Sequence, residues 1–141
     1  KAVNFIAAYP AGNRPTDEVR KMSQNLFDPA PIAELRILDQ DNSANLVNSL
    51  IDMFFAAAEP SAKEMLEAAR GNNAEKLSQI AHTLRATSGN LGAEACSLLC
   101  GELEEMALYH RQKVSTAGVS LCRKLIELLP ETMEILRQQR L

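Results

Sequence analysis

Histidine is the side chain best suited to group transfer near neutral pH, because much of its imidazole is uncharged there and keeps a free lone pair. The 141-residue chain has two histidines, His82 and His110. The apolar residues around His82 recur at helical spacing and predict the buried face of a helix, formed by Leu77, Ile80, Ala81 and Leu84. Because His82 falls outside that stripe, we expect its ring on the exposed face.

Small side chains surround His82 on the same predicted face. The residues one and two helical turns away are Ser78, Ala86 and Gly89, and Arg85 follows within side-chain reach of the ring. A partner protein could therefore approach the imidazole closely, and the cation would pair with a phosphoryl group placed on it. The pattern is compatible with a phosphoacceptor histidine whose docking face is Ser78, Gln79, Ala86 and Gly89, and an ordinary surface histidine is the alternative at this point.

The segment that begins at His82 resembles the signature of histidine-containing phosphotransfer (HPt) domains, which is His-x-Leu-Lys-Gly followed by small residues and a Leu-Gly pair. The matching positions are His82, Leu84, Leu91 and Gly92, with Thr87 and Ser88 at the small positions. Arg85 stands in place of the usual lysine, and Ala86 in place of the usual glycine. Arginine keeps the positive charge with a different reach, and alanine keeps the space nearly open. The similarity extends from about Phe27 to about Leu108.

The resemblance implies a function and the residues that carry it. A receiver domain would bring an aspartyl phosphate and its Mg²⁺, and His82 would accept the phosphoryl group and pass it to another receiver. Arg85 would stabilise the phosphoryl charge. In the family's register Glu104 lies opposite His82 and is expected to orient the ring, with an ordinary surface carboxylate as the alternative. The chain has no nucleotide-binding loop and no cofactor is expected, so we predict a monomeric shuttle intermediate and not an enzyme by itself.

Two other functions stay open at this point. An HPt-like module that binds receivers without accepting phosphate is kept as the alternative by the departures at Arg85 and Ala86. The phosphoacceptor helix pair of a sensor kinase is less favoured, because Thr83 and not an acidic residue follows His82, and no proline follows before Pro130. His110 has no organised neighbours and is interpreted as a surface histidine.

Composition indicates a single soluble domain. Hydrophobic residues make up 46% and charged residues 23%, which is ordinary for a globular protein. The net charge of -3 argues against a nucleic-acid-binding function, because binding to the phosphate backbone requires a basic face. No stretch resembles a membrane span or a signal peptide, so we expect the chain in the cytoplasm without direct membrane contact. A cytoplasmic part of a membrane-bound sensor kinase is compatible with this expectation.

Three cysteines occur among apolar neighbours, at Cys96, Cys100 and Cys122. They are interpreted as buried thiols. Cys96 and Cys100 share a helix face, but no histidine follows at zinc-site spacing, and no metal is assigned.

Helical patterns run through the chain, and no alternating strand pattern occurs. Residues 1–27 contain Pro10, Gly12 and Pro15 and are predicted to be a leader or linker with a short helix near residues 17–25. Residues 28–141 are predicted to form the HPt bundle. The leader suggests the C-terminal HPt domain of a hybrid sensor histidine kinase, with a free-standing shuttle as the second choice.

The predicted bundle begins with a covering helix after Asp28, which turns Ile32, Leu35 and Leu38 toward the core. A second helix follows a cap at residues 41–43, and Pro60 is expected to end or kink it. The His82 helix, a helix over 93–109 and a last helix over 115–138 with a bend at Pro130 complete the pattern. The expected fold is all-α, an antiparallel four-helix bundle with an additional N-terminal covering helix.

Overall fold

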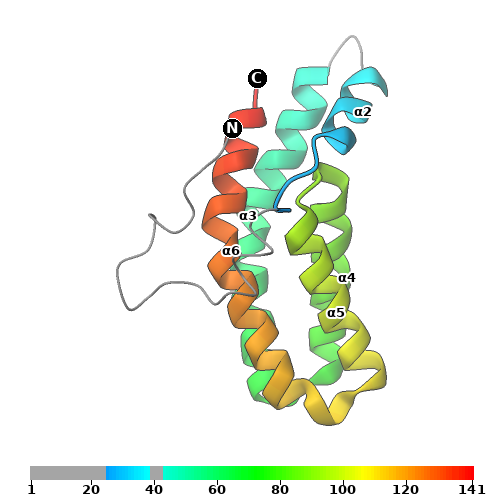
Figure 1. Ribbon diagram of the computed structural model, residues 1–141, viewed down its shortest axis with the longest axis vertical. Coiled ribbons are helices and arrows are strands. Elements are labelled where there is room, and N and C mark those ends of the chain that lie inside the picture. Colours follow the sequence, from blue (N-terminus) through cyan, green and yellow to red (C-terminus); the bar gives the residue numbers. More distant parts are fainter. Residues whose placement is uncertain (1–24, 39–42) are drawn as a thin grey trace.

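The computed structural model describes residues 25–38 and 43–141, and all the regular structure in these ranges is helical. The α-helices are α2 (Ala30–Leu38), α3 (Ser43–Arg70), α4 (Ala74–Leu91), α5 (Glu94–Tyr109) and α6 (Val119–Gln139). Helices α3 to α6 run alternately up and down the long axis, and α2 lies at the end where α3 begins and α6 ends (Figure 1). This confirms the predicted antiparallel bundle with a covering N-terminal helix.

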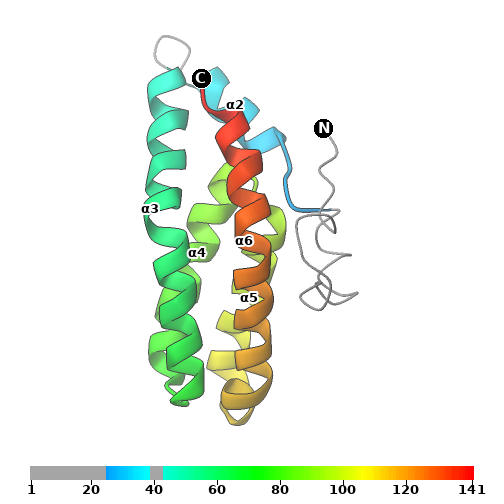
Figure 2. The same cartoon turned by 90° about the vertical axis from the view of Figure 1, so that its left-hand side faces the viewer.

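The four long helices form one continuous bundle. Helices α4 and α5 have the most extensive contact, and α3 packs against both α4 and α6 (Figure 2). Their apolar stripes meet in a core whose largest fully buried side chains are Phe54, Ile32, Ile51, Met65, Leu77, Leu91, Leu99, Leu103, Leu125, Leu128 and Leu136. Burial of these stripes is the main source of helix stability in such a bundle.

The three cysteines lie in the same core as free thiols. Burial raises the pKa of the Cys122 thiol to about 12, which keeps it protonated at neutral pH. Within residues 25–38 and 43–141, no group of histidine, cysteine, aspartate or glutamate side chains has the arrangement of a metal site.

Two prolines leave their helices uninterrupted. The prediction that the second helix ends or kinks at Pro60 is wrong about an end, because α3 continues from Ser43 to Arg70. Helix α6 likewise continues through Pro130. Both rings lie on exposed faces, where water can satisfy the carbonyl that each proline leaves without a backbone donor. Core burial on both sides of the proline then holds the helix together.

Two other sequence expectations differ from the structure. Leu38 was expected to face the core, but it is 81% exposed, because it is the last residue of α2 and extends beyond the surface that Ile32 covers. The last helix was expected to start at Ser115. The chain instead forms a 3₁₀ turn over Arg111–Lys113 and a π-helical turn over Val114–Gly118, and α6 starts at Val119. A π-helical turn has no simple periodic signal in the sequence.

Specific caps fix the two ends of α4, the helix that carries His82. The Asn73 side chain accepts a hydrogen bond of 3.1 Å from the Lys76 amide at the first turn. At the other end Gly92 takes a left-handed conformation with φ of 77°. The polypeptide then reverses directly into α5, which places these two helices side by side.

The segment before α2 is attached to this α4–α5 turn. The Asp28 amide donates a 2.8 Å hydrogen bond to the Gly92 carbonyl, and the Glu94 amide donates a 2.9 Å hydrogen bond to the Leu26 carbonyl. The Leu26 side chain is 3% exposed and belongs to the core. The last residues assigned to the leader therefore pack against the bundle.

Some sequence predictions fall outside the described residues. These are the leader up to residue 24, its short helix except for Asn25, and the cap at Asp41 and Asn42.

Candidate functional site

His82 lies on the exposed face of α4, and its side chain is 62% exposed. The opposite face of the same helix is buried through Leu77, Ala81 and Leu84. The apolar stripe therefore fixes the rotation of α4 and directs the imidazole away from the core.

Glu104 contacts His82 from the neighbouring helix α5. Its Oε2 atom lies 2.7 Å from Nδ1 of His82, and the carboxylate side chain is only 17% exposed. An ionised carboxylate can only accept, so Nδ1 must carry the hydrogen in this contact. In the neutral ring this leaves Nε2 with the free lone pair. In the described part of the chain, no hydrogen bond is made to Nε2.

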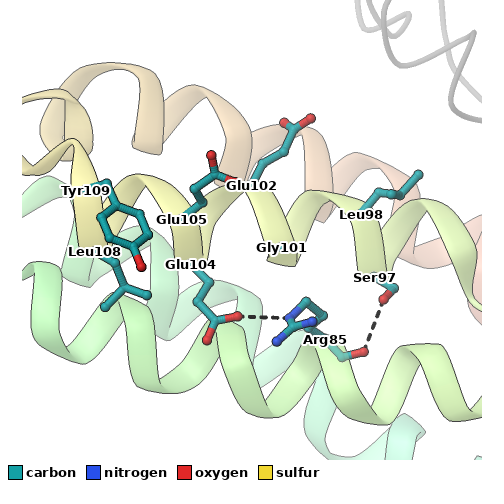
Figure 3. Close-up of a pocket in the computed structure, with 9 residues that line it drawn as sticks. All are labelled: Arg85, Ser97, Leu98, Gly101, Glu102, Glu104, Glu105, Leu108 and Tyr109. Carbon is teal, nitrogen blue, oxygen red and sulfur yellow. Dashed lines mark hydrogen bonds and ion pairs between the residues drawn. The ribbon is translucent and has the colours of Figure 1, made fainter.

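Arg85 binds the second oxygen of the same carboxylate. Its Nε atom lies 2.9 Å from Oε1 of Glu104, a charge-assisted contact between α4 and α5 (Figure 3). The Nη2 atom of Arg85 lies 3.4 Å from Nδ1 of His82. Because the proton on Nδ1 points to Glu104, we interpret this longer contact as a cation close to the ring and not as a second hydrogen bond.

Two residues of α5 support Arg85, and neither was predicted from the sequence. The Ser97 hydroxyl donates to the Arg85 backbone carbonyl at 3.2 Å (Figure 3). A Cβ atom at Gly101 would lie 3.3 Å from Cδ of Arg85. The absence of a side chain at Gly101 therefore leaves room for the aliphatic part of Arg85 to pack against α5. An isolated glycine inside a helical pattern was the available signal, because it costs about 1 kcal/mol relative to alanine.

The predicted docking residues surround His82 on α4. Gln79, Ala86 and Gly89 are exposed, and Ser78 is half-buried. The Thr83 hydroxyl donates to the Gln79 carbonyl at 3.2 Å, so it is engaged with the helix backbone. The structure thus places small or short groups on both sides of the ring along the helix.

Comparisons with known proteins identify the family to which this chain belongs. A family model described as the Hpt domain matches residues 49–139. The chain belongs to the Hpt family. The crystal structure of histidine-containing phosphotransfer protein B (HptB) from Pseudomonas aeruginosa PAO1 has a similar fold, with a TM-score of 0.69 and 23% identity over 82% of this chain and 94% of that chain. A comparison with curated proteins gives no match.

Family membership gives this HPt domain its general activity, which is histidine phosphotransfer. Domains of this kind are phosphotransfer modules and not enzymes with a nucleotide site of their own. In residues 25–38 and 43–141, no helix combines the length and the apolar character that crossing a membrane requires.

The small residues of the HPt signature have a structural role on the buried side of α4. Ser88 is fully buried, and its hydroxyl donates to the Leu84 carbonyl at 2.6 Å. The same hydroxyl lies 3.1 Å from the Cys96 thiol on α5. A small polar residue here lets the two helices approach closely beneath the exposed site.

His110 is not part of this arrangement. It is the C-terminal cap residue of α5, is exposed, and lines a hollow with Met106 and Lys113 that includes none of His82, Arg85 and Glu104. The structure brings His82, Arg85 and Glu104 together and leaves the second histidine at the far end of the helix.

Proposed function

We propose that this HPt domain accepts a phosphoryl group on Nε2 of His82 from the aspartyl phosphate of a receiver domain and passes it to another receiver. The observation that carries the proposal is the 2.7 Å contact between Glu104 and Nδ1 of His82. That contact selects the tautomer in which Nε2 is the nucleophile, on a ring that a partner protein can reach.

The transfer balances without a further reactant. The Nε2 lone pair forms a bond to phosphorus while the bond from phosphorus to the aspartyl oxygen breaks, and the aspartate leaves as a carboxylate. The imidazole gains positive charge, which Glu104 stabilises through the hydrogen on Nδ1. Transfer to the next receiver is the reverse reaction on a new aspartate.

Arg85 supplies charge for the transferred group. Phosphoryl transfer passes through a loose transition state in which positioning and charge neutralisation account for most of the catalysis. The guanidinium already lies beside the ring, and its Nη atoms can pair with phosphoryl oxygens while Nε stays on Glu104. We place the Mg²⁺ of the reaction on the receiver and not on this domain.

The alternative is a module that binds receivers without accepting phosphate. The geometry favours the active shuttle, because Arg85 reaches the ring region and the Ala86 side chain adds only one methyl group to the docking face. Incubation with a phosphorylated receiver distinguishes the two, since only a shuttle acquires acid-labile and base-stable phosphate.

The decisive variant is His82→Gln, with His110→Gln as its matched control. We expect the first to abolish labelling while leaving the helical circular dichroism signal unchanged, and the second to label as the wild type does. Labelling that survives in His82→Gln and disappears in His110→Gln would reject the site. The hybrid-kinase context and the cytoplasmic location stay predictions, which the mass and the cell fraction of the full gene product test.

A further inference from the structure

A surface hollow of about 640 Å³ lies on α5 directly beside the His82 site. Arg85 and Glu104 form part of its wall, so the hollow is continuous with the groups that contact the imidazole (Figure 3). From there it extends along α5 in the direction of Tyr109. The docking face predicted from the sequence lies on α4 and does not include this surface.

Exposed apolar side chains line both ends of the hollow. Leu98, Leu108 and Tyr109 are 60%, 48% and 74% exposed. Single apolar residues on a surface are ordinary, but three that line one hollow beside a reactive site offer a partner apolar contacts at both of its ends. Tyrosine and leucine offer a partner far more apolar area than the short side chains around His82 on α4.

Two carboxylates give the same surface its charge. Glu102 and Glu105 are exposed, line the hollow and extend from α5 away from α4 (Figure 3). Among the described residues neither of them forms an ion pair with a lysine or arginine. Lys113 and His110 line a neighbouring hollow with both carboxylates but form no ion pair with them. A basic side chain of a partner that covers this face would therefore complement the two carboxylates.

Gly101 keeps the centre of the hollow open. It belongs to the lining between the two carboxylates and Arg85, and any longer side chain at this position would fill the space. Glycine at this position lowers the intrinsic stability of α5, because it has a lower helix propensity than alanine.

We propose that the receiver that exchanges phosphate with His82 docks on α5 as well as on α4. It would place an apolar element in the hollow and a lysine or arginine against Glu102 and Glu105. The inference rests on the proposed function for the identity of the partner. A specific complex buries about 800 Å² on each protein, and a receiver that reaches His82 gains area of this size if it also lies over the adjoining hollow.

The test measures receiver binding and phosphate transfer separately. The receiver is the one that binds the wild-type chain most tightly in a panel of purified receiver domains from the source organism. The apolar variant is Leu98→Ala with Tyr109→Ala, and the charge variant is Glu102→Lys with Glu105→Lys. The matched controls are Met53→Ala and Glu64→Lys, because both residues are exposed on α3, which contributes no residue to the hollow.

We expect each α5 double variant to raise the Kd for the unphosphorylated receiver about tenfold or more, as truncation of central interface residues does. The charge variant should also reduce the dependence of Kd on salt. Labelling of His82 by phosphoramidate, a donor that needs no docking, reports on the integrity of the site. Both controls should match the wild type in every measurement.

The outcomes separate this inference from the proposed function. If the α5 variants bind the receiver as tightly as the controls do, docking on α5 is rejected even where phosphate transfer succeeds. If the variants lose binding but the wild type never gains phosphate, the result supports docking on α5 and rejects the shuttle function. If no receiver binds the wild type, both are rejected.

Discussion

Gly92 lies so close to the backbone of Asp28 that a Cβ atom at residue 92 would come within 2.0 Å of the Asp28 carbonyl oxygen. Its φ of 77° is also a conformation that side chains with a Cβ atom rarely adopt. The glycine of the Leu-Gly pair in the HPt signature therefore has a structural cause in this protein. It allows the segment before α2 to cross the end of the helix that carries His82.

Substitution of this glycine should destabilise the fold. We expect Gly92→Ala to reduce the free energy of unfolding by about 1 to 3 kcal/mol, because the backbone must shift and the left-handed conformation becomes strained. Gly71→Ala is the matched control, since a Cβ atom there would meet only ordinary contacts, the nearest at 3.5 Å. Urea unfolding of both variants checks the prediction, and equal stabilities would contradict it.

Shortening the chain from its N-terminus should reveal where the folded unit begins. A chain that starts near Leu26 should melt within a few degrees of the full chain, because the preceding residues contain few periodic apolar positions. A chain that starts at Pro29 loses the buried Leu26 side chain and the two backbone hydrogen bonds to the α4–α5 turn. It should melt at a distinctly lower temperature, by calorimetry. Equal melting of the two shortened chains would show that the 26–28 segment contributes nothing.

Removal of the Arg85 charge should slow phosphate transfer without unfolding the protein. We expect Arg85→Ala to reduce the transfer rate from a phosphorylated receiver tenfold or more, which corresponds to about 1.4 kcal/mol or more in the barrier. Arg85→Lys should keep most of the rate, because it restores the residue that is usual in the family. Rapid-quench kinetics measures the transfer rate. Equal rates for Arg85→Ala and the wild type would show that the arginine does not contribute to transfer.

A large side chain at residue 86 should block the partner and spare the fold. Ala86 is exposed one helical turn after His82, so Ala86→Trp costs only a few tenths of a kcal/mol in helix propensity. The indole would hold the receiver's aspartate away, and transfer is sensitive to displacements of about 1 Å. We expect slow labelling by a receiver and normal labelling by phosphoramidate. Unchanged transfer from the receiver would mean that the partner avoids this part of α4.

One buried carboxylate should make stability depend on pH. Burial, and secondarily the nearby Glu134 carboxylate, raises the pKa of Glu131. Folding therefore favours the protonated form, and stability falls as the pH rises from the unfolded pKa through the higher folded pKa. Glu131→Gln should raise the melting temperature at pH 7 and lose this advantage below about pH 4. The exposed Glu64→Gln is the control, and an equal effect of both variants at pH 7 would exclude burial as the cause.

Much of the fold and of the site could be predicted because their signals are local. Helical periodicity of apolar residues indicated the core faces of α3 to α6, and the same stripe placed His82 on the opposite side of α4. The position of Glu104 came from the resemblance to the HPt family and not from periodicity. The 2.7 Å contact depends on how α4 and α5 align across their turn.

The features that the sequence did not predict depend on tertiary packing. Pro60 and Pro130 have strong local preferences against helix interiors, but packing of the rest of α3 and α6 overrides them. The role of Gly101 exists only because the Arg85 stem crosses it from another helix. A glycine inside a helical pattern marks the position as unusual, but the sequence of α5 alone does not show that the Arg85 stem lies against it.

His82, Arg85 and Glu104 all come from a single helical hairpin, formed by α4 and α5, in which His82 and Glu104 are 22 residues apart. Contacts between neighbouring elements require little loop closure and form quickly during folding. The active geometry therefore depends on one tight reversal of the chain, while α3 and α6, which pack against this hairpin, supply rigidity. His82, Arg85 and Glu104 contact one another within the hairpin, so sequence changes in α3 and α6 can alter stability while these three contacts are kept.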